Sequence, residues 1–70
     1  MQEIITDSEV CWIFMYENNT LITYPFEVLG IGQKVFYPDN LTAVCEPTEV
    51  DANKKIKELN LIDPRNDETI

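Results

Sequence analysis

The feature that most constrains the fold is an apolar segment at residues 9–16, with the sequence EVCWIFMY. β-Branched and aromatic residues fill this segment and it contains no Gly or Pro, which is typical of a β-strand. The next residues, Glu17-Asn18-Asn19, are turn formers, because asparagine tolerates the left-handed backbone of tight hairpins. Residues 20–24 return as the partner strand, and Pro25 either ends that strand or places it at a sheet edge. The segment therefore predicts a β-hairpin.

Both faces of this hairpin are apolar. With a three-residue turn, Tyr16 lies opposite Thr20 and Trp12 opposite Tyr24, so that the aromatic residues gather on one face. The other face then holds Cys11, Ile13, Met15, Leu21 and Thr23. A two-residue turn changes the partners but not this conclusion, because residues 10–16 carry no polar side chain except the Tyr16 hydroxyl. One helix covers only one face, so the second must be covered by the remaining strands or by another protein chain.

The rest of the chain supplies three more short strands and one helix. Residues 2–6, 33–37 and 41–45 have strand composition, and Thr48 is a good N-cap for a helix that ends near Asn60. Asp51 occupies the capping-box position, and an apolar stripe follows at Ala52, Ile56 and Leu59. The predicted fold is α+β and mostly β: a small SH3-like rolled sheet or barrel of about five short antiparallel strands with one C-terminal helix. We expect one domain at residues 1–62 and a flexible acidic tail at 63–70.

Composition excludes several classes of function. The chain has 70 residues, with 5 basic and 13 acidic side chains and a formal net charge of −8. Direct binding to nucleic-acid phosphates or to an anionic membrane needs a cationic surface, so neither is expected. Histidine is absent, which removes imidazole catalysis and the most common metal ligand. The apolar runs are far shorter than the roughly 18 residues of a membrane span. We expect no enzyme activity, no catalytic residue and no cofactor.

The two cysteines, Cys11 and Cys45, are expected to be small buried apolar residues. The N-terminus opens on Met1-Gln2-Glu3 and lacks the basic start of a cleavable targeting segment, which favours a cytoplasmic protein with reduced thiols. Without a C-x-x-C spacing and without histidine, the two cysteines do not complete a tetrahedral zinc site, so no metal site is predicted. A disulfide or a redox role is the alternative interpretation.

Negative charge is concentrated in the first half of the chain. Residues 1–33 contain five acidic residues and no basic residue, and every Lys and Arg lies from Lys34 onward. One interpretation is solubility. The functional interpretation is that the acidic hairpin steers the protein to a cationic surface of a protein partner. The candidate contacts are Glu9, Glu17, Glu27 and Asp39, with Tyr16 or Tyr24 as anchors. The aromatic face holding Trp12, Phe14 and Tyr24 is either core or an interface.

Residues 30–38, with the sequence GIGQKVFYP, resemble the opening strand of Tudor-like or SH3-like interaction domains. In those domains a glycine precedes a Lys-Val-aromatic strand and a turn, and the segment is similar in particular to the polymerase-binding domain of CarD-type transcription factors. The resemblance implies a barrel. Where the family has a glycine-containing turn, this sequence has Asp39-Asn40, and no binding residue is carried over.

These observations lead to two hypotheses about function. The first is a small acidic inhibitor or modulator, of the kind that phages use in host takeover or against host defence, which occludes a basic and possibly nucleic-acid-binding surface of a partner protein. The second is a structural accessory subunit or a homodimeric interaction module with an SH3-like fold.

Overall fold

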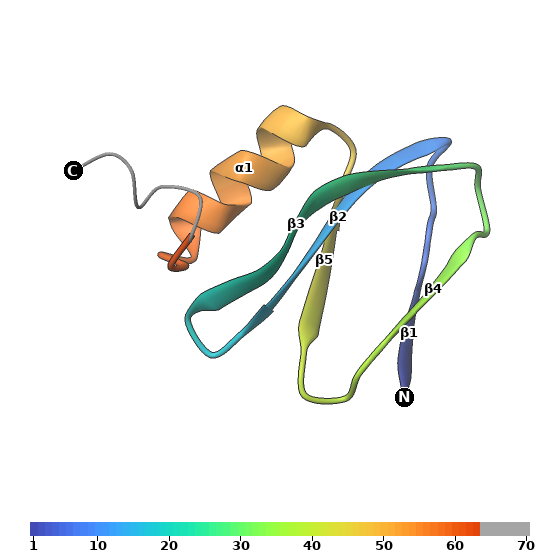
Figure 1. The fold of residues 1–70 in the computed structure, drawn as a ribbon. Coiled ribbons are helices and arrows are strands. Elements are labelled where there is room, and N and C mark those ends of the chain that lie inside the picture. Colours follow the sequence, from blue (N-terminus) through green and yellow to red (C-terminus); the bar gives the residue numbers. More distant parts are fainter. Residues whose placement is uncertain (64–70) are drawn as a thin grey trace.

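The computed structural model describes residues 1–63 and shows five antiparallel strands followed by one helix (Figure 1). This confirms the predicted small α+β rolled sheet. The elements are β1 (Gln2–Ile5), β2 (Val10–Glu17), β3 (Thr20–Leu29), β4 (Lys34–Tyr37), β5 (Thr42–Glu46) and α1 (Glu49–Glu58). The predicted tail begins at Asp63, and its residues 64–70 lie outside the described part of the chain.

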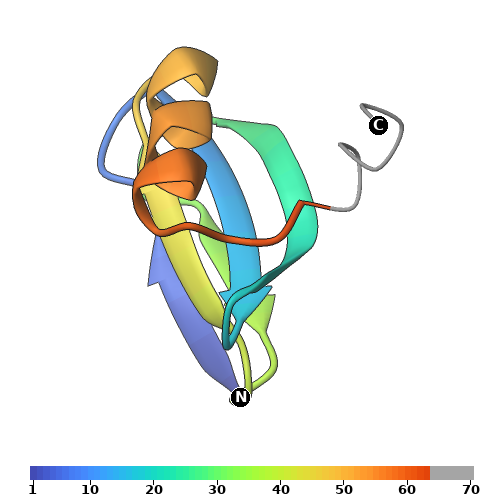
Figure 2. The same cartoon turned by 90° about the vertical axis from the view of Figure 1, so that its left-hand side faces the viewer.

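The strands form two sheets. β2 is the centre of a three-stranded sheet in the order β3-β2-β5, and β1 pairs with β4 in a two-stranded sheet. Figure 1 shows the three-stranded sheet between α1 on one side and β1 with β4 on the other. Figure 2 shows the segment after α1 running to the start of β3, where Thr20 and Ile62 form a parallel bridge.

One face of the three-stranded sheet packs against α1. Phe14 and Leu21 from the sheet meet Ala52 and Ile56 from the helix, and all four side chains are buried. Trp12, Tyr16, Val44, Leu59 and Leu61 are partly buried around them. The predicted apolar stripe of the helix is therefore confirmed as its packing face.

The opposite face of the same sheet is also core. Cys11, Ile13 and Met15 are buried there. The two-stranded sheet covers them with Ile4 from β1 and with Val35 and Tyr37 from β4. The second face of the hairpin is therefore covered by the remaining strands, which was one of the two possibilities that the sequence left. The central strand β2 is enclosed on both sides.

Of the two turn lengths left open for the β2–β3 hairpin, the structure has the two-residue turn. Glu17 pairs with Thr20 and Tyr16 with Leu21, which leaves a two-residue turn with Asn18 at φ 56°. Leu21 consequently lies on the helix side with Phe14, and not with Cys11 as the longer turn implied. A one-residue change in turn length moves every side chain of a strand to the other face, which explains why Leu21 lies with Phe14.

β3 also runs further than predicted, through Pro25 to Leu29. The pairing shifts between Ile13 and Met15 and again between Met15 and Tyr16, and both shifts insert an extra residue in β3. The Thr23 hydroxyl accepts a hydrogen bond of 2.9 Å from the backbone N–H of Met15, which satisfies that donor at the bulge. β3 is an edge strand, so the N–H that Pro25 lacks leaves no ladder bond unmade.

Both ends of α1 lie where the sequence predicts them. Thr48 Oγ1 accepts from the backbone N–H of Asp51 at 3.1 Å, which makes Thr48 the N-cap. At the other end Leu59 is the C-cap and Asn60 adopts φ 56°, which stops the helix.

Candidate functional site

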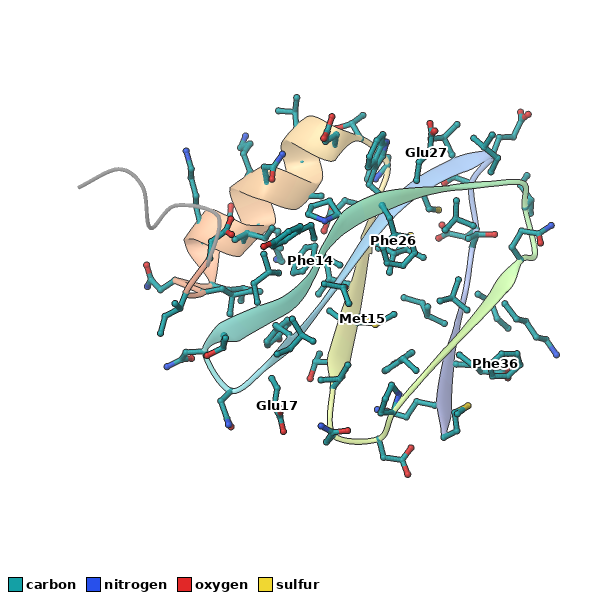
Figure 3. The ribbon with its side chains drawn as sticks, in the orientation of Figure 1. Phe14, Met15, Glu17, Phe26, Glu27 and Phe36 are labelled. Atoms are coloured by element: carbon teal, nitrogen blue, oxygen red, sulfur yellow. The ribbon has the colours of Figure 1, made fainter. Side chains whose placement is uncertain are left out.

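The predicted partner contacts lie at two different ends of the hairpin. Glu17 is at the β2–β3 turn, and Glu27 is near the far end of β3; Figure 3 labels both and shows them well apart. Glu9 belongs with Glu27, because its carbonyl accepts from Gly30 N–H at 2.8 Å just beyond β3. Asp39 belongs with Glu17, because the neighbouring Asn40 side chain donates to Glu17 Oε2 at 3.2 Å.

The two carboxylates at the turn end make contacts within the chain. Asp39 Oδ1 forms an ion pair of 3.1 Å with the Met1 ammonium. Glu17 accepts the Asn40 hydrogen bond already described. Gln2 ties the same turn down by donating its side-chain amide to the carbonyls of Asp39 and Leu41 at 3.2 and 3.0 Å. These carboxylates hold the two turns together, which competes with binding a partner.

The other end of the sheet carries a different arrangement, centred on Trp12. Trp12 pairs with Glu27 on β3 and with Glu46 on β5. Directly paired residues point to the same face of a sheet, so the indole lies between two carboxylates whose strands are roughly 10 Å apart. We call Trp12, Glu27 and Glu46, together with the nearby Glu9, the Trp12 rim. The Trp12 and Glu46 side chains are half-buried, whereas Glu9 and Glu27 are exposed.

No Lys or Arg in the described part of the chain forms an ion pair with the Trp12 rim. Among residues 1–63, the ion pairs join Met1 to Asp39 and Lys55 to Glu58, and neither involves the rim. The lysines lie on β4 and on α1. Exposed Glu49, in the first turn of α1 directly after β5, adds a further negative charge. The rim therefore presents an anionic surface around an aromatic ring.

The two tyrosines proposed as anchors differ in their surroundings. Tyr16 is half-buried in the helix-side core, with its ring centroid 6.3 Å from that of Phe14. Tyr24 is 45% exposed on the edge strand β3. Phe14, from the same predicted aromatic face, is fully buried core. The aromatic face, which the sequence left as either core or interface, is thus divided. Phe14 is core, Tyr24 is on the surface, and Trp12 is half-buried.

A second group of reactive side chains lies at the same end of the molecule. The carboxylate of Asp7 and the thiols of Cys11 and Cys45 have ligand atoms within 4.8 Å of one another. Both cysteines are free thiols. Burial raises the pKa of the Cys45 thiol to about 12, with further contributions from its hydrogen bond to Cys11 and from the negative charges of Asp7 and Glu46. We call these three residues the thiol cluster.

Sequence reasoning found part of the Trp12 rim, because Glu9 and Glu27 were candidate contacts and Trp12 belonged to the aromatic face left as either core or interface. It missed Glu46, which becomes a neighbour of Trp12 only through the β2–β5 pairing, and it missed the thiol cluster as a group. The spacing of Cys11 and Cys45 shows no metal motif, and Asp7 comes from the turn between β1 and β2. No local pattern marks either group, since each is assembled from three separate segments.

No family model, curated protein or solved structure matches this chain. The resemblance of residues 30–38 to Tudor-like and SH3-like domains therefore carries no family assignment. Within residues 1–63, no helix has the length and apolar character needed to cross a membrane.

Proposed function

We propose that this chain is a small non-enzymatic protein that binds a basic surface of a protein partner and occludes it, acting as an inhibitor of the phage host-takeover or anti-defence type. The observation that supports this proposal is the position of Trp12 between Glu27 and Glu46 on three neighbouring strands. Tryptophan is among the residues most enriched at the energetic centre of protein interfaces.

The chemistry of the Trp12 rim favours an arginine or lysine of the partner. A guanidinium or ammonium group stacks on an indole face through cation–π attraction. The carboxylates on either side of the ring then neutralise the charge of the partner's cationic group and accept its hydrogen bonds. An arginine can donate to one carboxylate with two N–H groups at once. A partner surface rich in such side chains is one that normally binds nucleic-acid phosphates, and the carboxylates take the place of those phosphates.

The sheet holds these groups in place before binding. Trp12 sits on the central strand, which is buried on both faces, and its neighbours on both sides are backbone-paired. A preorganised site avoids much of the entropy cost of ordering side chains on association. The uncompensated negative charge also accelerates encounter with a cationic partner.

The proposal is tested with the protein's own fluorescence, because Trp12 is the single tryptophan of the chain. An arginine-rich peptide without tryptophan is titrated into the protein at low and at high salt. Saturable quenching that weakens strongly with salt is the expected result. The double variant Glu27→Gln/Glu46→Gln should weaken binding by roughly tenfold or more, since each charge-assisted hydrogen bond contributes about 1.5–3 kcal/mol.

Glu3→Gln is the matched control, because Glu3 is an exposed glutamate on β1 and is not part of the Trp12 rim. If Glu3→Gln weakened peptide binding as much as the rim variant does, the loss would be due to the change in net charge and not to the Trp12 rim. A salt-independent affinity would remove the electrostatic mechanism. Proteins captured from host lysate by the wild type and by Glu3→Gln, but not by the rim variant, then identify the partner.

A homodimeric or accessory module is the second candidate, and the outer face of the β1–β4 sheet favours it. Glu3, Ile5, Lys34 and Phe36 share that face. Phe36 is 58% and Ile5 49% exposed, and Figure 3 shows Phe36 pointing away from the rest of the molecule. The face is also self-complementary in charge, since a two-fold axis would bring Glu3 of one copy to Lys34 of the other.

Sedimentation velocity separates the two candidates. A monomer across the accessible concentration range favours the inhibitor. A dimer that Phe36→Ser dissociates, and that the Trp12 rim variant leaves intact, favours the homodimer.

A further inference from the structure

We propose that the thiol cluster, Asp7 with Cys11 and Cys45, binds one Zn²⁺ ion. The three ligand atoms lie within 4.8 Å of one another. They come from the β1–β2 turn, from β2 and from β5. Such a site would join the β1 side of the molecule to the three-stranded sheet.

The diagonal placement of the two cysteines in the strand register suits a shared metal ion better than a disulfide. Cys45 pairs with Ile13, so Cys11, two residues further along β2, is its diagonal neighbour. Diagonal neighbours are roughly 7 Å apart, with their Cβ atoms somewhat closer, whereas a disulfide requires Cβ atoms roughly 3.8 Å apart. Two thiolates on one tetrahedral Zn²⁺ lie roughly 3.8 Å from each other, because each Zn–S bond is about 2.3 Å. The three ligand atoms lie within 4.8 Å of one another, which is compatible with that geometry.

The ligand types select the class of metal. Two thiolates and one carboxylate suit a borderline-soft divalent ion such as Zn²⁺, whereas Mg²⁺ and Ca²⁺ prefer all-oxygen sites. Three protein ligands leave one tetrahedral position for water. Asp7 is exposed while Cys11 is 1% exposed, so the carboxylate side of the cluster is the route by which the ion arrives and the side on which that water lies.

The surroundings of the cluster orient its ligands, and within residues 1–63 no ion pair involves Asp7. The Ser8 hydroxyl donates to Asp7 Oδ1 at 3.4 Å, and the Cys11 thiol donates to the Ser8 carbonyl at 4.0 Å. Outer contacts of this kind commonly hold metal ligands in position. Glu46 adds negative charge beside Cys45. A divalent cation balances this local charge, and each thiol releases its proton to solvent as its S–Zn bond forms.

A metal in this position suits the size of the chain. Domains this small gain little stability from their core alone and commonly rely on a disulfide or a structural metal. Because the strands already bring both sulfurs together, binding needs no refolding of the sheet. The expected effect is a rise in melting temperature that grows with free Zn²⁺ concentration.

The test uses the reduced full-length protein, prepared metal-free in a phosphine reductant and titrated with Co²⁺ and then Zn²⁺. One equivalent of Co²⁺ should produce thiolate-to-metal charge-transfer absorption with the strong ligand-field bands of a tetrahedral site, and Zn²⁺ should bleach both. Cys11→Ser and Cys45→Ser should abolish the charge-transfer band. Asp7→Ala should weaken Zn²⁺ binding by roughly tenfold or more, as measured by competition with a chromophoric chelator.

Glu58→Gln is the matched control, since it removes an exposed charge at the end of α1, outside both the cluster and the Trp12 rim, and should leave the affinity unchanged. If a cysteine variant does not fold, the Zn²⁺ affinity of Asp7→Ala tests the proposal instead, because Asp7 is exposed and its truncation does not open the core. Folded wild type without charge-transfer absorption overturns the proposal. Wild-type affinity in Asp7→Ala overturns the three-ligand site. Fast air oxidation of the folded protein to an intramolecular disulfide, with no metal bound by the reduced form, assigns the pair to redox chemistry instead.

Discussion

Thr6 and Gly30 are joined by a hydrogen bond of 2.6 Å, in which the Thr6 hydroxyl donates to the Gly30 carbonyl. The same hydroxyl accepts from the Gln33 backbone N–H at 2.9 Å. The Thr6 backbone adds bonds to Gln33 and Gly32, each of 2.9 Å. Thr6 is the one polar side chain buried among the described residues, at 2% exposure. It fixes the loop through which β3 passes to β4, where Gly30 and Gly32 adopt φ of 105° and 81°.

Thr6→Val should therefore destabilise the protein by about 1–3 kcal/mol, because it leaves the Gly30 carbonyl and the Gln33 N–H without this partner in a site closed to water. Urea denaturation followed by Trp12 fluorescence measures the change. Thr6→Ser keeps the hydroxyl and should lose clearly less. A Thr6→Val protein as stable as the wild type would show that water replaces the hydroxyl.

Both faces of the central strand should contribute to one cooperative core. Ile13, on the β1–β4 side, and Ile56, on the helix side, are both buried. Replacing either with valine should cost about 0.5–1.5 kcal/mol at an unchanged denaturant slope. Ile31→Val, at a position that is 65% exposed, is the control and should be neutral. Two separate unfolding transitions in either variant would mean that the two-stranded sheet unfolds independently.

Removal of the helix cap tests a local interaction. Thr48→Ala eliminates the acceptor for the Asp51 N–H and should cost about 1 kcal/mol, while Thr48→Ser restores most of it. Because α1 covers one face of the sheet, the loss should appear in global unfolding as well as in far-ultraviolet circular dichroism. A loss of helical signal with unchanged global stability would show that the sheet folds without α1.

Cys45 should react slowly with alkylating reagents. Its pKa of about 12 leaves a thiolate fraction at pH 8 roughly a thousandfold below that of a thiol at its ordinary value. Iodoacetamide kinetics on a metal-free Cys11→Ala variant isolate this thiol; burial, which is the largest cause of the raised pKa, and the charges of Asp7 and Glu46 remain in that variant, whereas the hydrogen bond and the charge of Cys11 are lost. The same variant unfolded in urea supplies the reference rate. Equal rates in the folded and unfolded protein would contradict the environment described for Cys45.

Substitution of Glu27 or Glu46, the two glutamates beside Trp12, should not lower the stability of the protein as substitution of Thr6 does. Glu27 and Glu46 have no ion-pair partner among residues 1–63, and each faces the negative charge of the other. Glu27→Gln and Glu46→Gln should leave stability unchanged or raise it by a few tenths of a kcal/mol at low salt. Destabilisation above about 1 kcal/mol would give these carboxylates a structural role.

Much of the fold was predictable because it depends on local chemistry. The apolar strand at β2, the Asn18-Asn19 turn, the Thr48 cap and the apolar stripe ending at Leu59 each follow from side-chain properties within a few residues. The need to cover both faces of the hairpin also followed from residues 10–16 alone, since no polar face exists there. Turn length was not predictable, because residues 10–16 are apolar on both faces and the hydrophobic pattern therefore does not select one register.

By itself, the sequence determined that this is an acidic, histidine-free α+β chain whose central hairpin must be enclosed on both sides. Only the tertiary structure decided which side chains meet. Glu27 and Glu46 reach Trp12 through two different strand pairings, and Asp7 joins Cys11 and Cys45 across three segments. The physical reason is that register, which depends on bulges and on the packing of whole faces, sets these neighbours, and no spacing along the chain encodes it.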